Sequence, residues 1–130
     1  MELTDQRLYD FACQVSTSLT DAQLYPFSDN FQAARVAGKW FMLTTILKGK
    51  RILILKGTPE DVKALQLSYA DILPGYHMNK KHWYTVQAGP SISEKLLEEL
   101  ITDSYLLVVE KLPKKYRPLG WTAHLPQNSE

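Results

Sequence analysis

The order of apolar patterns along the 130-residue chain predicts an α+β fold, a two-layer sandwich in which an antiparallel sheet carries helices on one face. Three short apolar stretches follow one another with only tight turns between them, which is typical of an antiparallel meander. Helical patterns precede this run, follow it and close the domain, so the expected order of elements is α-β-β-β-α-β-α. A chain of this length can bury a full hydrophobic core as one domain.

The first helix is expected from about Thr4 to Thr17, because Leu8, Phe11 and Val15 fall on one helical face. Threonine is a common helix cap, since its hydroxyl can accept a hydrogen bond from a free backbone N–H of the first turn. The first element is therefore predicted to be an amphipathic helix that packs on the sheet.

Three strands are expected next, over Ala33 to Ala37, Trp40 to Leu47 and Arg51 to Lys56. The preceding segment, Asp21 to Asn30, is expected to be a connection, because Pro26 interrupts it. The third strand has apolar residues at successive positions, so both of its faces are expected to be covered, as in a central strand.

The stretch Gly57-Thr58-Pro59-Glu60-Asp61 has the features of a helix start: a threonine cap, a proline in the first turn and two acids at the positive end of the helix dipole. This helix is expected to end by about Ala70. A loop from Asp71 to Tyr76 and a fourth strand from His82 to Gln87 are expected after it.

A long helix is expected to begin after a cap at Ser91 or Ser93 and to continue to about Glu110. The predicted domain spans residues 1–117. Residues 118–130 are expected to form an irregular, partly mobile C-terminal tail that Trp121 could dock on the domain.

The net charge of +1 conceals a segregation of charge along the chain. Between Asn30 and Pro59 there are six basic residues and no acid, and the segment from Ile72 to Ser93 has two lysines and no acid. Acid-free basic stretches favour an anionic partner, because a partner responds to the local field rather than to the sum of charges.

Composition and cysteine content suggest where the protein works. The N-terminus lacks the basic and apolar regions of a signal peptide, and no apolar run is long enough to span a membrane. The single cysteine, Cys13, rules out an internal disulfide and fits a reducing cytoplasm. We expect a cytoplasmic, monomeric protein in which the Cys13 thiol is half-buried and unreactive.

The segment from Pro74 to Val86 concentrates histidine, lysine, asparagine and aromatic residues, and it contains no carboxylate. Cationic and hydrogen-bonding groups beside flat rings suit a phosphate backbone or another anionic ligand. Within it, Asn79 is expected to brace a turn, His77 is expected to support the loop, and Trp83 is expected in the core, with base stacking as its alternative role.

Several segments together resemble the MmcQ/YjbR-like family, described as DNA-binding proteins with a "double wing" α/β fold related to bacterial frataxin. The resemblance spans roughly Leu3 to Arg117 and implies a frataxin-like fold and DNA binding, with no catalytic residue or cofactor to carry over. It rests on Pro74-Gly75-Tyr76-His77-Met78-Asn79-Lys80-Lys81-His82-Trp83, Ile101, Asp103-Ser104-Tyr105, Leu107-Val108-Val109, Leu112-Pro113-Lys114-Lys115 and Arg117, and more weakly on Tyr25-Pro26-Phe27.

Candidate DNA contacts are the basic and polar residues of the two hairpin turns, the entry to the fourth strand and the end of the long helix. Such contacts would be made mainly to phosphates and would give affinity with little sequence selection. The last group could instead complement the negative end of that helix. The candidates are Lys39, Lys48, Lys50, Arg51, Asn79, Lys80, Lys81, His82, Lys114, Lys115 and Arg117.

Two other functions remain open, and neither implies a cofactor. The basic surface could dock an acidic protein partner, or the segment from His77 to Trp83 could line the pocket of a small-anion-binding protein or an enzyme, with Asp71 or Asp103 orienting a histidine. Metal binding is not expected, because no paired ligand spacing is present. The acidic ridge that binds iron in frataxins is also not expected, since the early acids Glu2, Asp5 and Asp10 are sparse and Arg7 lies among them.

Overall fold

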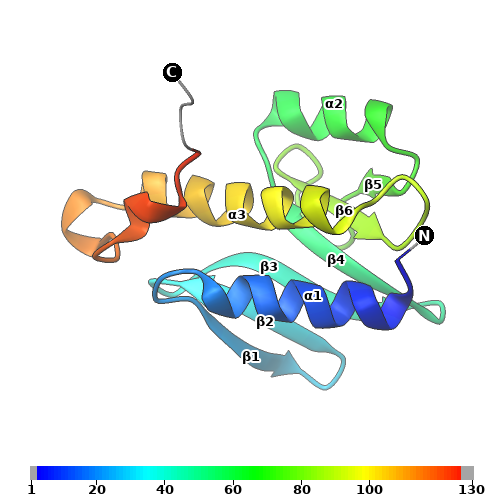
Figure 1. The fold of residues 1–130 in the computed structure, drawn as a ribbon, viewed down its shortest axis with the longest axis horizontal. Coiled ribbons are helices and arrows are strands. Elements are labelled where there is room, and N and C mark those ends of the chain that lie inside the picture. The colour runs from blue at the N-terminus through cyan, green and yellow to red at the C-terminus, as the bar shows by residue number, and fades with distance from the viewer. Residues whose placement is uncertain (1–2, 127–130) are drawn as a thin grey trace.

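The fold, taken from a computed structural model that describes residues 3–126, is a six-stranded antiparallel sheet with helices on one face (Figure 1). The order of strands across the sheet is β1-β2-β3-β4-β6-β5. The α+β sandwich predicted from the sequence is therefore confirmed. The strands are β1 (Gln23–Ser28), β2 (Phe31–Val36), β3 (Lys39–Leu47), β4 (Lys50–Lys56), β5 (Ile72–Pro74) and β6 (Trp83–Gln87); the helices are α1 (Asp5–Ser18), α2 (Pro59–Ser68) and α3 (Glu94–Lys111), followed by the 3₁₀ turns η1 (Lys114–Tyr116) and η2 (Trp121–His124).

Two strands are additions to the predicted order. The segments expected to be a connection and a loop contain β1 and β5, so the order is α-β-β-β-β-α-β-β-α. Both lie at the outer edges of the sheet, and each contains a proline, Pro26 or Pro74. Proline disfavours a strand prediction because it has no N–H for the ladder, but the outer side of an edge strand needs no such donor.

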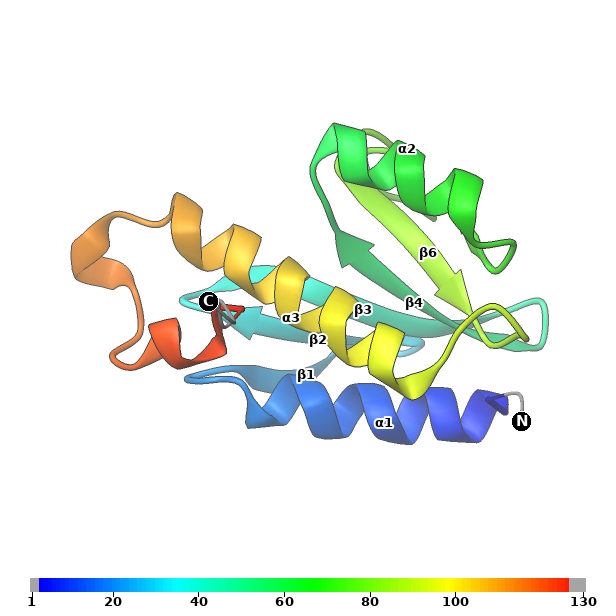
Figure 2. The same ribbon diagram turned by 45° about the horizontal axis from the view of Figure 1, so that its top comes forward.

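The three helices begin where the sequence predicts. Hydroxyl groups of Thr4, Thr58 and Ser93 each accept a hydrogen bond from the backbone N–H three residues later, at 3.0 to 3.1 Å. The apolar faces of α1 and α3 then pack side by side on the sheet (Figure 2). The main core lies between these helices and the sheet, with Tyr105 and Leu8 fully buried in it.

The opposite face of the sheet has its own small core. Ala33, Leu43 and Ile54 are at most 2% exposed there, although no helix covers them. Aromatic side chains from the sheet and the loop between β5 and β6 cover these residues instead. The prediction that β4 is apolar on both faces is confirmed, because its four central residues are all buried.

The sheet splits at one end, between β3 and β4. The ladder of these strands ends at the pair Met42 and Leu55, and Phe41 is the extra residue of a bulge against β2. Beyond this point β4 and β6 turn away from β1, β2 and β3, and α3 passes over the gap (Figure 2). The buried hydroxyl of Ser104 on α3 bridges the gap, donating to the carbonyl of Phe41 and accepting from the N–H of Lys56.

The C-terminal segment docks back on the domain as far as residue 126. The ring of Trp121 packs against the main core, as predicted, and Nε2 of His124 accepts a hydrogen bond of 3.1 Å from the backbone N–H of Thr20. The end of the predicted mobile tail, residues 127–130, and the early acid Glu2 lie outside the described residues.

Candidate functional site

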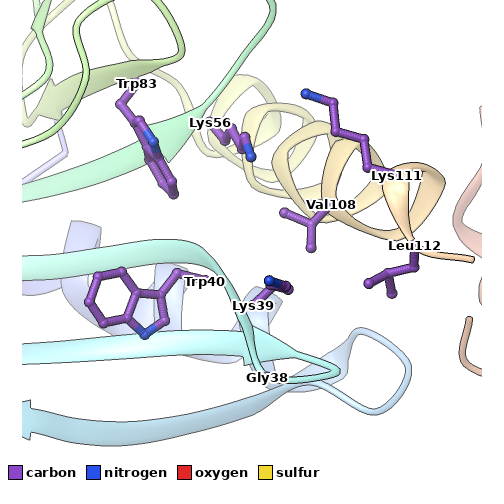
Figure 3. A pocket seen from close by; sticks show the side chains of 8 residues that line it. All are labelled: Gly38, Lys39, Trp40, Lys56, Trp83, Val108, Lys111 and Leu112. Atoms are coloured by element: carbon purple, nitrogen blue, oxygen red, sulfur yellow. The ribbon is translucent and has the colours of Figure 1, made fainter. Parts of the chain in front are cut away.

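An open pocket of about 530 Å³ lies at the end of the sheet where β3 and β4 separate (Figure 3). We call it the split pocket. Its residues come from the start of β3, the end of β4, the start of β6 and the C-terminal end of α3. They are Gly38, Lys39, Trp40, Lys56, Trp83, Val108, Lys111 and Leu112.

Three ammonium groups converge on the split pocket, and no carboxylate lines it. Lys39 begins β3, Lys56 ends β4 and Lys111 ends α3. Burial lowers the pKa of Lys56, and the positive charges of Lys111 and Lys39 lower it further. Lys56 is therefore close enough to the other two lysines to be repelled by them, and an anion placed beside Lys56 would relieve that repulsion.

Two tryptophan rings form the aromatic walls of the split pocket (Figure 3). The indole N–H of Trp40 donates a 2.7 Å hydrogen bond to the hydroxyl of Tyr25, and the ring of Phe27 packs edge-on against it at 4.7 Å between centroids. The Trp83 ring lies 5.7 Å from the ammonium nitrogen of Lys56, within the range of a cation–π contact. Both rings are thus held in place by neighbours.

This combination suits a ligand that has both a flat ring and a negative charge. Aromatic side chains offer a stacking surface to any nucleobase, while lysines contact phosphate as point charges. The volume also lies within the range of ordinary ligand pockets. The split pocket can therefore hold one unpaired nucleotide, or a small aromatic anion of similar size.

Only one of the predicted DNA-contacting residues, Lys39, lines the split pocket. Sequence reasoning missed Lys56, Lys111 and Trp40 as site residues. Each lies at the end of an apolar element, where a basic or aromatic residue is common in any protein. Their convergence depends on the register of β3 against β4 and on the position of α3, and neither could be derived from the sequence.

The two basic hairpin turns do not form one surface. The turn before Lys39 and the turn containing Lys48 lie at opposite ends of β3. Nine residues of strand separate them by about 30 Å, from the usual rise of 3.3 Å per residue. The DNA contacts predicted at these turns are therefore two separate predictions, and each turn is considered by itself.

A second open pocket, of about 430 Å³, lies at the other end of the helix-free face. Lys48, Lys50, His77 and Lys80 line it, together with apolar residues of β3, β4 and β5. The ammonium group of Lys80 donates a 2.8 Å hydrogen bond to the carbonyl of Gly75, so this lysine also braces its own loop. Three predicted DNA-contacting residues, Lys48, Lys50 and Lys80, thus meet His77 here, in a pocket that neither Trp40 nor Trp83 lines.

Other predicted residues have structural contacts. The side chain of Asn79 accepts a 2.8 Å hydrogen bond from the N–H of Lys81, which confirms that Asn79 braces the turn. The carbonyl of His82 accepts a hydrogen bond from Gly57 at the start of the α2 segment. The guanidinium of Arg51 lies 4.3 Å from the ring centre of Tyr9 on α1, so it faces the helix layer.

Of the basic residues after α3, one has a structural contact and two are exposed. The guanidinium of Arg117 donates to the carbonyls of Leu112 and Glu110, at 3.0 and 2.8 Å, and so closes the end of the helix. Lys114 and Lys115 are exposed. Of the two roles considered for this group, Arg117 has the helix-capping role, while the two lysines are free to extend the basic surface.

Burial raises the pKa of the Cys13 thiol, which keeps it protonated and unreactive. Within residues 3–126, no cluster of three or more histidine, cysteine, aspartate or glutamate side chains could hold a metal ion. In the same range, no helix is long and apolar enough to cross a membrane.

Comparison with known proteins places this architecture in a family. The family model described as YjbR matches residues 17–107, which include all six strands and most of α3. The chain belongs to the YjbR family. The predicted YjbR-like resemblance is therefore confirmed.

Relatives and solved structures agree with this membership. Over 111 residues the chain is 42% identical to YbdF of Escherichia coli O157:H7, covering 85% of this chain and 91% of that protein. It is 30% identical to YjbR of Escherichia coli K12 over 79 residues, covering 61% of this chain and 67% of that protein. The names of both relatives state no activity, so family membership alone assigns none.

Two solved structures share the fold of this YjbR-family chain. A crystal structure of a Deinococcus radiodurans protein has a TM-score of 0.74 and 34% identity, covering 88% of this chain and 85% of that one. A crystal structure of a Pseudomonas syringae protein has a TM-score of 0.62 and 29% identity, covering 81% and 98%. The likeness therefore extends over most of each molecule.

Proposed function

We propose that this protein is a binding protein for single-stranded nucleic acid, with DNA as the polymer, and that the split pocket is its binding site. The observation that carries the proposal is the convergence of Lys39, Lys56 and Lys111 on a pocket walled by Trp40 and Trp83. An unpaired base would stack on a tryptophan ring, and its flanking phosphates would contact the lysines.

A single strand fits this site better than a duplex. Bases in a duplex are stacked on one another and cannot present a free face to the tryptophans. The lysines also converge into a recess instead of lying along a convex edge that could follow a groove. The two hairpin turns are about 30 Å apart, which further disfavours simultaneous contact of both turns with one groove of a duplex.

The pocket favours binding over catalysis. Its polar side chains are lysines and indole N–H groups, with no histidine, serine, cysteine or carboxylate lining it, and we assign the lysines to charge pairing with an anion. We accordingly propose a non-enzymatic role. The cytoplasmic location and monomeric state predicted from the sequence remain predictions.

Intrinsic tryptophan fluorescence tests the proposal directly. The variant Trp121→Phe leaves Trp40 and Trp83 as the only fluorophores of this kind, because the sequence has three tryptophans. Titration with a deoxythymidine decamer should quench the fluorescence as a base stacks. With three lysine–phosphate contacts, log affinity should fall against log salt with a slope of about −2, from about −0.7 per contact in single strands.

Three comparisons complete the experiment. A duplex of the same length should bind more weakly than the decamer. A slope near zero, or no quenching at low salt, would exclude nucleic-acid binding at this pocket. Thymidine monophosphate binding as tightly as the decamer would instead assign the pocket to a small aromatic anion, the second function that its size supports.

A further inference from the structure

A second kind of site lies on the helix side of the sheet, in a groove between α2 and α3 above β6. The groove has a volume of about 370 Å³, and its walls are apolar side chains of the two helices, Leu65 and Leu100 among them. Three carboxylates line it as well: Asp61 from α2, and Glu99 and Asp103 from α3. Its charge is therefore opposite to that of the split pocket.

The floor of the groove contains a buried phenol. The side chain of Tyr84 is only 1% exposed, yet its hydroxyl has no hydrogen-bond partner among residues 3–126. In that range every side-chain oxygen or nitrogen that is sealed from solvent does have a partner, so the Tyr84 hydroxyl must retain access to solvent. Because Tyr84 lines the groove, this access leads into it.

The carboxylates and this hydroxyl line the same groove, and two of the carboxylates, Asp103 and Asp61, act on the phenol electrostatically. Burial raises the pKa of Tyr84, and the charges of Asp103 and Asp61 raise it further. Burial also raises the pKa of Asp103, with additional contributions from Asp61 and Glu99. The negative groups therefore act on one another and on the phenol, and a cation placed between them would be favoured.

The one basic residue at the rim of the groove does not neutralise it. Lys56 lines both sites, but in Figure 3 its ammonium group lies on the side of the split pocket, among the residues that line it. The neighbours that shift its pKa are Lys111 and Lys39 and not the carboxylates of the groove. The ionisable groups that face the groove from α2, α3 and β6 are thus all acidic or phenolic.

We propose that this groove binds an aliphatic organic cation, an ammonium or guanidinium group on an alkyl stem. The carboxylates of Asp61, Glu99 and Asp103 hold the positive group, the hydroxyl of Tyr84 accepts one of its N–H bonds, and the stem lies against the leucines. Among residues 3–126 no group of three such side chains could hold a metal ion, so the proposed ligand is an organic cation, whose several N–H donors can reach more than one carboxylate.

Calorimetric titration with 1,6-diaminohexane at low salt tests the site. The diamine should bind and 1,6-hexanediol should not, because the diol has the same stem without charge. Asp103→Asn should weaken diamine binding about tenfold. Tyr84→Phe, which keeps the buried ring, should weaken it several-fold. Binding should also weaken as the pH falls, since protonation of Asp103 removes a charge.

Glu98→Gln is the matched control, because Glu98 is the neighbour of Glu99 on α3 but does not line the groove. It removes the same charge and should change diamine affinity less than twofold. Equal losses in Glu98→Gln and Asp103→Asn, or equal binding of diol and diamine, would overturn the proposal. Asp103→Asn also relieves repulsion, so the variant should unfold at a higher urea concentration than the wild type, which separates lost binding from lost folding.

Two sources of the cation can then be distinguished. A short peptide with one lysine flanked by leucines, titrated in parallel, represents a side chain of a protein partner. Tighter binding of this peptide than of the diamine would assign the groove to a protein segment. The reverse order would assign it to a free polyamine, and weak binding of both, at the level of the diol, would exclude the site.

Discussion

The Oγ atom of Ser104 lies 2.5 Å from the carbonyl oxygen of Phe41, at the point where β3 leaves β4. The same hydroxyl accepts a 2.9 Å hydrogen bond from the N–H of Lys56 on the other strand. One side chain of α3 therefore provides hydrogen-bond partners for a backbone group of each strand where the ladder between them has ended.

Replacing this hydroxyl should cost stability. In Ser104→Ala the carbonyl of Phe41 and the N–H of Lys56 are left buried without their partner, so the free energy of unfolding should fall by about 1–3 kcal/mol. Urea denaturation followed by circular dichroism measures it. Thr102→Ala, two residues earlier on α3, is the control. A loss no larger than that of the control would mean that water restores both bonds.

Removal of two pocket charges should reduce DNA binding. In Lys56→Met with Lys111→Met, one of the three proposed phosphate contacts remains, so the slope of log affinity against log salt should change from about −2 to about −0.7. The double variant Lys48→Met with Lys50→Met removes the same charge at the other end of the sheet. It should preserve the slope; if it reduced the slope instead, the hairpin turn would be the binding surface.

Asp71 should make stability depend on pH at the acid end. Hydrogen bonds from Ser91 lower the pKa of Asp71, with the side-chain bond as the largest cause. The ionised form is therefore favoured in the folded state: its stabilisation is present above the ordinary carboxyl pKa of about 3.9 and is lost as the pH falls through the lowered folded value. Urea titrations at a series of pH values from about pH 5 downward measure this loss of unfolding free energy.

The pH dependence due to Asp71 is isolated by comparing the wild type with Asp71→Asn, and the control is the wild type compared with Asp29→Asn. The difference in unfolding free energy between wild type and Asp71→Asn should shrink as the pH falls, because protonated Asp71 no longer differs in charge from asparagine. Asp29→Asn removes a carboxylate from the exposed turn between β1 and β2, where Asp29 makes no side-chain hydrogen bond with residues 3–126. If the difference in unfolding free energy between the wild type and Asp71→Asn were constant with pH, Asp71 would not be the source of the pH dependence.

Arg117 should matter for stability and the lysines beside it should not. Arg117→Ala removes two hydrogen bonds to the last carbonyls of the α3 segment, which should reduce the free energy of unfolding by about 1–2 kcal/mol. Lys115→Ala on the exposed turn should change it by less than about 0.5 kcal/mol. Thermal denaturation of both variants measures the difference, and equal effects would show that the cap is dispensable.

Local patterns were sufficient to predict most of the fold. The caps at Thr4, Thr58 and Ser93, the apolar faces of the helices and the two-sided burial of β4 all follow from residues close together in the sequence. The edge strands could not be predicted in this way. Pro26 and Pro74 are compatible with strands only where one side needs no donor, and edge position is a property of the whole sheet.

The site was less accessible to sequence reasoning, because it depends on contacts between distant segments. Lysines were chosen by their clustering along the chain, whereas Lys39, Lys56 and Lys111 are each separated from the next by at least 17 positions. The sequence did contain one useful indication: Lys56 and Lys111 each occupy the last position of an element rich in apolar residues. Only the divergence of β3 from β4 brings those ends together with the tryptophans.

The same divergence divides the sheet mechanically. Strands β1, β2 and β3 form one half and β4, β6 and β5 the other, and the six residue pairs from Met42–Leu55 to Leu47–Lys50 join the halves at one end only. At the far end the two halves are bridged by Ser104 of α3, which contacts Phe41 of one half and Lys56 of the other. A strand of DNA lying in the opening would hold the two halves at a fixed spacing, so the amide of Lys56 should exchange its hydrogen more slowly in the complex than in the free protein.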